Sequence, residues 1–310
     1  MYISRVPTAP APLLSPPDDV AAEVEVDEAL LRRLLVAQAS ALADEPLERF
    51  AEGWDNVLFR IGTRSIARLP RRAIAAPQVE HEARWLPELA RSLPLRLPVP
   101  QQLGRPGEGF PFPWTISPFI EGTPLAGCVL EPERVAAELG GFLAALHRLE
   151  APADAPTSAV RGVSPRERSK ALLAKLGAER VRSRVDTRSL EALWRSLVAA
   201  PDWDANPVWC HGDFHPFNLL ARDGGVAAVL DWGDLHGREP APDLACIWMA
   251  LPVSAHAAFR SAYGPIDDAT WQRAKAWGLY FGVMFLDAGA GGAGDGATRL
   301  GEDTLARVLA

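Results

Sequence analysis

The 310-residue chain has only three cysteines, and they are far apart. Cys128, Cys210 and Cys246 lack the short spacings of a structural zinc site, and each lies among apolar residues, so we expect three free thiols. Free thiols are typical of a reducing compartment, which makes the cytoplasm the expected location. No run of about 18 uncharged apolar residues occurs, so neither a membrane span nor a membrane partner is expected. The N-terminus holds too many prolines for a secretory signal.

A basic excess is also lacking, and the net charge of −7 comes entirely from the last third of the chain. Residues 1–201 hold 25 acidic and 25 basic side chains, whereas residues 202–310 hold 14 acidic and 7 basic ones. This balance does not suit a nucleic acid partner. The acidic third favours either a cationic ligand or a solvated surface that keeps the protein soluble.

The N-terminal part combines a loose segment with a small mixed α/β region. Residues 1–22 are rich in proline and alanine and are predicted to be disordered. Residues 57–61 and 65–69 are rich in β-forming side chains and flank a Gly-Thr turn, which predicts a hairpin. Helices are predicted at residues 27–43 and 76–93, and a further strand at residues 114–120. Pro87 should kink or shorten the second of these helices.

The remainder of the chain is predicted to be mostly helical. Pro132 occupies a favoured first helical position, and Ser164 with Glu167 forms a capping box ahead of a helix of about four turns. One strand pair, at residues 219–221 and 226–230, interrupts the helices. The glycine-rich stretch 289–296 is predicted to be a loop, because glycine disfavours a helix interior. The other helices are predicted at residues 189–199, 243–250, 254–262, 268–286 and 302–309.

The stretch His211-Gly-Asp213-Phe-His215 has three potential metal ligands at alternate positions. On a strand they would share one face and could bind a metal, as in a metallohydrolase. However, Gly212 and Pro216 interrupt a regular strand, and the chain has only six histidines to supply further ligands. A metal cage is therefore the weaker of two interpretations.

The stronger interpretation is a site for phosphoryl transfer. Asp213 is followed five residues later by Asn218, and an apolar strand then ends in Asp231. In this layout Asp213 would accept the proton of an attacking hydroxyl, while Asn218 and Asp231 would hold Mg²⁺ on the nucleotide phosphates. A positioned carboxylate suffices as a base, and the metal neutralises charge that develops in the transition state.

The run from His211 to Leu220, followed by Val-Leu-Asp231-Trp-Gly-Asp234, resembles the aminoglycoside phosphotransferase family. The similarity is greatest to the branch with aminoglycoside 2″-phosphotransferases and macrolide phosphotransferases. It implies an α+β, bilobal, protein-kinase-like fold with a small antiparallel N-lobe sheet and a mostly helical C-lobe. Further motifs follow the family's order over about residues 47–251: Glu52-Gly-Trp-Asp-Asn56, Ile-Ala-Arg68-Leu-Pro, Glu80-His-Glu82-Ala-Arg-Trp-Leu, Ile-Ser-Pro-Phe119-Ile120-Glu-Gly and Pro-Ala-Pro-Asp243-Leu-Ala.

The resemblance implies ATP or GTP as donor, Mg²⁺ as cofactor and a role for each matched residue. Asp213 matches the catalytic base, and Asn218 and Asp231 match the metal ligands. Arg68 stands where kinases place a lysine, and its guanidinium can still bind phosphates bidentately. No full G-x-G-x-x-G is present, so Asp55 or Asn56 and main-chain groups would replace the missing glycines. The residues implied in nucleotide binding are Gly53, Asp55, Asn56, Arg68, Glu82, Phe119 and Ile120, with Glu80 as the competitor of Glu82.

The same resemblance divides the chain into a tail (1–22), an N-lobe (23–117), a hinge (118–122) and a C-lobe (123–310). A small-molecule hydroxyl compound, expected to be cationic and similar to an aminoglycoside, would be the acceptor, and the enzyme is expected to be a monomer. A macrolide would want an apolar cleft instead. Candidate acceptor residues are the acids Asp267, Asp268, Asp287, Glu302 and Asp303, and the apolar side chains Tyr280, Phe281, Met284 and Phe285.

Two other functions remain open at the level of sequence. A metabolic kinase for a sugar or amino alcohol would use the same catalytic residues. A nucleotide-binding protein without turnover would have no need of a base and two metal ligands. A protein kinase fits less well, because no activation loop is evident after Asp231.

Several neighbouring residues are predicted to serve the fold rather than the reaction. His211 should fix the catalytic loop, and Asp243, which precedes an apolar helix as an N-cap would, should bond loop backbone. Asp234 suits either a supporting or a substrate-facing role. Glu239 is predicted at the surface. Four tryptophans are predicted in the core: Trp209, Trp248, Trp271 and Trp277.

Overall fold

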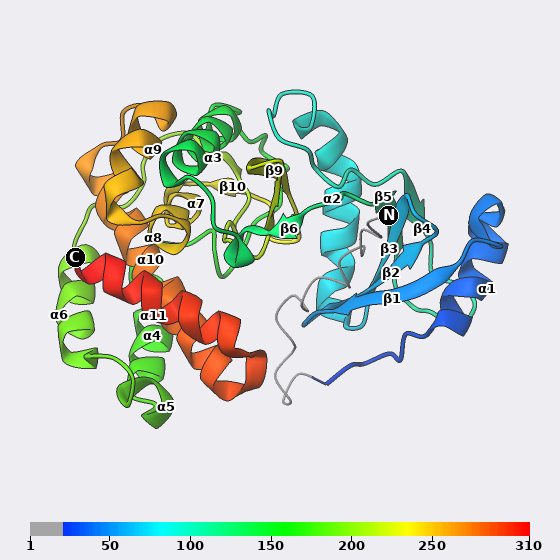
Figure 1. Cartoon of the computed structure of the whole chain (residues 1–310), viewed down its shortest axis with the longest axis horizontal. Helices are drawn as coiled ribbons and strands as arrows, with labels where there is room; N and C mark the ends of the chain where they lie inside the picture. The colour runs from blue at the N-terminus through cyan, green and yellow to red at the C-terminus, as the bar shows by residue number, and fades with distance from the viewer. Residues whose placement is uncertain (1–20) are drawn as a thin grey trace, which may run out of the picture.

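The computed structural model describes residues 21–310, which form two groups of elements that lie side by side (Figure 1). The group drawn from blue to cyan is a sheet with two helices, and the group drawn from green to red is mainly helical. The predicted α+β class is therefore confirmed. Residues 1–20, which make up most of the predicted tail, lie outside the described residues, and the predicted lobe boundaries stay a prediction.

The N-lobe sheet has five antiparallel strands in the order β1-β2-β3-β5-β4. The predicted hairpin is confirmed, because β2 and β3 pair with Phe59 opposite Ala67 and turn at Gly62. β1 and β4 were not predicted. β1 is an edge strand with two consecutive exposed positions, so its sequence lacks the alternation of apolar and polar residues that indicates a strand. The strands are β1 Leu47–Glu52, β2 Asn56–Ile61, β3 Ser65–Pro70, β4 Gln102–Gly104 and β5 Trp114–Pro118.

Two helices pack on this sheet from different sides (Figure 1). α1 (Glu28–Gln38) is capped by the Asp27 side chain, which accepts from Leu30 N–H at 2.7 Å. Its four buried leucines pack with Val57, Phe59 and Ile61 of β2 in a separate apolar cluster. These contacts explain why a short amphipathic helix is stable here.

The second N-lobe helix, α2 (Ala76–Leu89), stands between the sheet and the C-lobe (Figure 1). It ends two residues after Pro87, four residues short of the predicted end, so the predicted early end is confirmed. Leu86 and Leu89 belong to the large C-lobe core rather than to the N-lobe cluster. α2 therefore fixes the two lobes against each other and places the side chain of Glu82 between them.

The C-lobe is built around α10, which has 21 residues and packs against α11 and several shorter helices (Figure 1). Pro132 begins α3 as predicted, and the predicted capping box at Ser164 is present. Three of the predicted core tryptophans are buried, and Trp271 is partly buried against Trp248. The helices are α3 Pro132–His147, α4 Ser169–Leu176, α5 Glu179–Arg182, α6 Thr187–Leu197, α7 Ala241–Leu244, α8 Cys246–Ala250, α9 His256–Tyr263, α10 Asp268–Ala288 and α11 Asp295–Leu309.

Short strands next to the N-lobe hold the segment between β7 and β10. β8 (Leu219–Arg222) and β9 (Gly225–Val229) form the predicted hairpin, and β6 (Thr123–Pro124) pairs with β8. β7 (Val208–Cys210) pairs with β10 (His236–Arg238), which was not predicted because Gly237 and two polar residues carry no strand signal.

Two predictions for the C-lobe are wrong. Gly289–Ala293 forms a π-helical turn, and α11 already begins at Asp295, so residues 289–296 are not a simple loop. Gly292 and Gly294 supply positive φ angles at this junction, a conformation that glycine adopts without strain. Glu239, which was predicted at the surface, is buried, and its carboxylate accepts a hydrogen bond from Arg273 at 2.6 Å. Within residues 21–310, no helix is both long and apolar enough to cross a membrane.

Candidate active site

The segment 211–218 connects β7 to β8, and β9, the partner strand of β8, lies on the side of the C-lobe next to the N-lobe (Figure 1). The second residue of the segment, Gly212, has a φ of +85°, and a Cβ there would lie 2.5 Å from the carbonyl oxygen of Asp234. Any other residue would be strained and would collide, so this position requires glycine. Asp213 follows directly after this tight turn.

Three side chains hold the Asp213 carboxylate. Arg161 Nη2 donates to Oδ1 at 2.8 Å, His215 Nε2 lies 3.1 Å from Oδ2, and Asn218 Nδ2 lies 3.4 Å from Oδ2. Burial alone would raise the pKa of Asp213, but the charges of His215 and Arg161 outweigh it and hold this pKa well below its usual range. Asp213 is therefore an ionised, fixed carboxylate.

The His211 side chain holds this loop through hydrogen bonds and is not a metal ligand. Its Nε2–H donates to Leu230 O at 2.9 Å, and its Nδ1 accepts from the backbone N–H of Asp213 at 3.2 Å. Both ring nitrogens are thus used within the fold, which removes the metal cage and confirms the predicted role of His211.

Asp243 supports the same loop through its backbone. It accepts from the backbone N–H groups of His211 and Gly212, each at 2.7 Å. The predicted backbone role of Asp243 is confirmed, but it is not an N-cap, since it lies inside α7.

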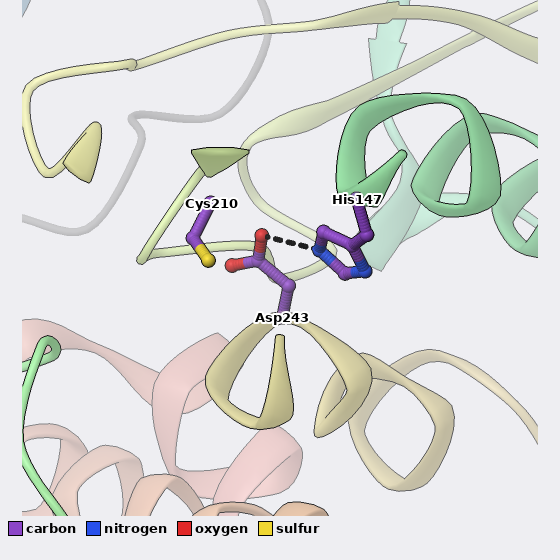
Figure 2. A group of neighbouring side chains, drawn as sticks. All are labelled: His147, Cys210 and Asp243. Carbon is purple, nitrogen blue, oxygen red and sulfur yellow. Dashed lines mark hydrogen bonds and ion pairs between the residues drawn. The ribbon is translucent and has the colours of Figure 1, made fainter. Parts of the chain in front are cut away.

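Figure 2 shows His147, Cys210 and Asp243, the group of potential metal ligands whose ligand atoms lie within 4.8 Å of one another in the described part of the chain. His147 Nε2–H donates to Asp243 at 3.2 Å, and Tyr263 OH donates to the other ring nitrogen at 2.9 Å. Burial raises the pKa of the Cys210 thiol, which bonds Glu239 O at 3.1 Å. With every ligand atom engaged, this cluster supports the segment 211–218.

The β8–β9 hairpin brings Asp231 next to Asn218. Leu230 N–H donates to Asn218 O at 2.8 Å, and Asp231 follows with a φ of +55°, an uncommon backbone conformation for a residue other than glycine. The Asn218 amide nitrogen donates to Asp213 O at 3.0 Å, so its oxygen is left for a ligand. A carboxylate and an amide oxygen are donors that suit Mg²⁺, so these two residues fit such an ion.

Arg68 of β3 reaches the same place from the N-lobe. Its guanidinium donates to Glu82 of α2 at 2.5 Å and to Asp231 at 3.1 Å. Burial opposes the charge of Arg68, but Glu82 and Asp231 keep its pKa above the usual value. Glu82 is buried whereas Glu80 is exposed, so Glu82 is the partner of Arg68. With its oxygen toward the guanidinium, the Asn56 amide also accepts from Arg68 at 2.9 Å.

The loop between β1 and β2 holds the Gly53–Asp55 part of the predicted nucleotide site. Asp55 is paired with Arg72 at 2.8 Å, and its charge contributes to the raised pKa of Asp234 in the C-lobe. This loop therefore lies near Asp234. Trp54 at its tip is 42% exposed and makes no ring contact with another aromatic side chain of the described residues.

The predicted hinge residues follow β5 directly. Phe119 N–H donates to Arg64 O at 2.8 Å, so this donor is already used inside the N-lobe. Ile120 packs with Leu220 and Ala228 near the catalytic segment, and its N–H has no backbone acceptor among residues 21–310. Of the two residues, Ile120 is thus the better placed to donate a backbone hydrogen bond to the base of a nucleotide.

Asp234, three residues after Asp231, lies among charged groups. Burial raises its pKa to about 6; Arg161 opposes this shift, while Asp213, Asp231 and Asp55 add to it. The sequence motif did not indicate that four carboxylates and two guanidinium groups lie close together here. They belong to Asp55, Asp213, Asp231 and Asp234 and to Arg68 and Arg161.

Most of the predicted acceptor acids are occupied within the fold. Asp287 is buried against Lys175 and Arg180, Asp267 caps α10, and Glu302 pairs with Arg184. Of the aromatic candidates, Phe281 lies beside Asp213 through Arg161, whose guanidinium carbon is 4.8 Å from the ring centroid. Phe285 lies 5.0 Å from the ring of His215. The sequence motifs did not indicate Arg161 as a residue of this site, because it lies in a loop that carries no recognisable motif.

A model of the phosphotransferase enzyme family matches residues 46–277, about three quarters of the chain. The chain belongs to this family. It is a phosphotransferase that acts on a hydroxyl group, as the sequence resemblance predicted. A search of curated proteins found no match.

Solved structures with a similar fold include enzymes of both predicted classes. The GDP and kanamycin complex of APH(2")-IIia is 17% identical, with a TM-score of 0.67 over 90% of this chain and 97% of that one. The macrolide 2'-phosphotransferase MphH from Brachybacterium faecium is 21% identical, with a TM-score of 0.57 over 89% of this chain and 97% of that one. The streptomycin–ATP complex of APH(2")-IIa is 17% identical, with a TM-score of 0.58 over 85% and 91%. These likenesses confirm the bilobal kinase-like fold.

Proposed function

We propose that the protein transfers the γ-phosphoryl group of ATP or GTP to a hydroxyl of an aminoglycoside-like or macrolide-like antibiotic. The observation that carries this proposal is the arrangement of Asn218 between Asp213 and Asp231, with Arg68 reaching Asp231 from the other lobe. Solved relatives of this fold are described with GDP, with ATP and with aminoglycosides.

Each residue has a distinct part in the proposed reaction. Asp213 accepts the proton of the acceptor hydroxyl, and its low basicity is no obstacle, because the transition state of phosphoryl transfer is loose and places little demand on a base. Arg68, oriented by Glu82, binds nucleotide phosphates in place of a lysine.

Asn218 and Asp231 would hold Mg²⁺, which supplies positive charge against the phosphate oxygens. Gly53, Asp55 and Asn56 cover the phosphates. The hinge around Phe119 and Ile120 binds the purine base of the nucleotide through Ile120 N–H.

The acceptor side favours neither antibiotic class over a metabolic substrate. The acidic third of the chain suits a cationic acceptor, but Asp267, Asp287 and Glu302 already have partners in the fold. A kinase for a sugar or an amino alcohol therefore stays the second candidate, since it would use the same base and metal ligands.

A coupled assay of nucleotide turnover tests the proposal. Purified protein is incubated with Mg²⁺, with ATP or GTP in parallel, and with a panel of aminoglycosides, macrolides, amino alcohols and sugars. Turnover that depends on an antibiotic and disappears in Asp213→Ala supports the proposal. Turnover only with sugars or amino alcohols supports the metabolic kinase, and nucleotide binding without any turnover contradicts both.

A further inference from the structure

Arg161 lies in the connection between α3 and α4, 52 residues away from Asp213 in sequence. Its Nη2 donates to Asp213 Oδ1 at 2.8 Å, and the side chains of the two residues are only 18% and 23% exposed. A charge-assisted hydrogen bond with this degree of burial is among the stronger ones in a protein. Within the described chain, Arg161 is thus the one hydrogen-bond donor to the Asp213 carboxylate that comes from outside the catalytic loop.

The contacts of the carboxylate divide between its two oxygens. The catalytic loop reaches Oδ2 through His215 and Asn218, whereas Arg161 reaches Oδ1. Held at both oxygens, the carboxylate group cannot rotate freely about its bond to Cβ. Oδ1 has only this one donor and can still accept a second hydrogen bond, so a hydroxyl can bind there while Arg161 stays in place.

The segment that carries Arg161 is built to keep it there. Ser158 Oγ accepts from Arg161 N–H at 3.0 Å, and Ser158 O accepts from Gly162 N–H at 2.9 Å. A Cβ at Gly162 would lie 2.7 Å from Ser158 O and 3.3 Å from the ring of His236, so the turn is closely packed. The backbone of Arg161 is therefore placed before any substrate binds.

The guanidinium is also held at its flat face and has a donor to spare. Its central carbon lies 4.8 Å from the ring centroid of Phe281, a cation–π contact. Its Nε is buried and has no hydrogen-bond partner within residues 21–310, which is an uncommon state for a buried donor.

We propose that Arg161 is a positioning residue of the phosphoryl transfer, whose guanidinium fixes Asp213 in the one orientation that accepts the hydroxyl proton. This inference rests on the proposed function, because it assumes that Asp213 is the base. Positioning matters more than basicity here, because a misplacement of about 1 Å can cost roughly a hundredfold in rate.

The test compares Arg161→Gln with Arg161→Lys and Arg161→Ala, using wild-type protein and the acceptor found in the panel assay. We expect kcat to fall about 10- to 100-fold in Arg161→Gln with the KM for nucleotide unchanged, and less in Arg161→Lys. Added guanidinium ion should restore part of the turnover of Arg161→Ala, which a defect of folding would not allow. Thermal melting of each variant shows whether it is folded.

Arg168→Gln is the matched control. This arginine lies in the same segment and also contacts an aromatic side chain, but its Nη2 donates to Tyr280 OH at 2.8 Å and not to Asp213. Its kcat should stay within about threefold of wild type, since the geometry of the base is untouched. An equal loss in Arg168→Gln, or a wild-type kcat in Arg161→Gln, would overturn the inference. Wild-type protein without acceptor-dependent turnover would instead defeat the proposed function.

A crystal structure of Arg161→Gln tests the same point without any acceptor. We expect the Asp213 carboxylate to turn or to occupy more than one orientation, while His215 and Asn218 stay in place. A single, unchanged orientation of Asp213 would show that the catalytic loop alone fixes the base and would contradict the inference.

Discussion

Replacement of Asp234 by asparagine should stabilise the protein, and by more at high pH than at low pH. Burial and the neighbouring carboxylates of Asp213, Asp231 and Asp55 raise the pKa of Asp234 from 3.8 to about 6, although Arg161 opposes the shift. The folded state thus binds a proton between about pH 4 and 6 that the unfolded chain has already released. Stability falls as pH rises through this window, because deprotonation is costlier in the folded state.

The size of the effect follows from the two pKa values. At about 1.36 kcal/mol per pH unit, ionised Asp234 costs the folded state about 3 kcal/mol at pH 8 and about 1 kcal/mol at pH 4.5. The asparagine side chain cannot ionise, so the advantage of Asp234→Asn should grow by about 2 kcal/mol between these pH values. At pH 8 the full gain of about 3 kcal/mol corresponds to a melting temperature about 4–5 °C higher for a chain of this length.

Thermal unfolding of wild type and Asp234→Asn from pH 4.5 to pH 8 checks this prediction. Asp223→Asn is the control, because Asp223 lies exposed in the β8–β9 turn with a φ of +54°, which asparagine also tolerates. We expect the control to stay within about 0.5 kcal/mol of wild type at every pH. A gain in Asp234→Asn that does not vary with pH, or a loss at pH 8, would refute the reasoning about charge.

Three further substitutions probe the supports of the site. Glu82→Gln breaks the buried pair with Arg68, so we expect a loss of about 3 kcal/mol in urea unfolding and weaker nucleotide binding in a titration. Asp243→Asn leaves one backbone N–H of the catalytic loop without an acceptor; about 1–3 kcal/mol should be lost, and unchanged stability would contradict the assigned role. Gly212→Ala forces a Cβ to within 2.5 Å of Asp234 O, so kcat should fall at least about tenfold in the coupled assay while nucleotide affinity stays near wild type.

The sequence predicted those parts of the fold whose signals are local. The β2–β3 hairpin, the helix start at Pro132 and the capping box at Ser164 each depend on residues close together in the chain. β1 and β10 were missed, because an exposed edge strand and a three-residue strand gain their stability from pairing with distant segments.

The site divides in the same way. The proximity of Asp213, Asn218 and Asp231 could be predicted, because the motif that carries them is contiguous over 21 residues. The contact of Arg161 with Asp213 and the burial of Glu239 with Arg273 could not be predicted, because each joins segments that only the tertiary fold brings together. The acidic excess of residues 202–310 was a weak guide to an acceptor, since several of those acids pair with arginines or cap helices.

The central claim is that Asp213 acts as the base for phosphoryl transfer to a small-molecule hydroxyl, and transfer of radiolabel tests it most directly. Wild type and Asp213→Asn are each given γ-labelled ATP or GTP, Mg²⁺ and the acceptor, and nucleotide binding is measured in parallel. We predict labelled acceptor from wild type, little or none from Asp213→Asn, and equal nucleotide binding by both. Equal labelling by both proteins would contradict the assignment of Asp213 as the base.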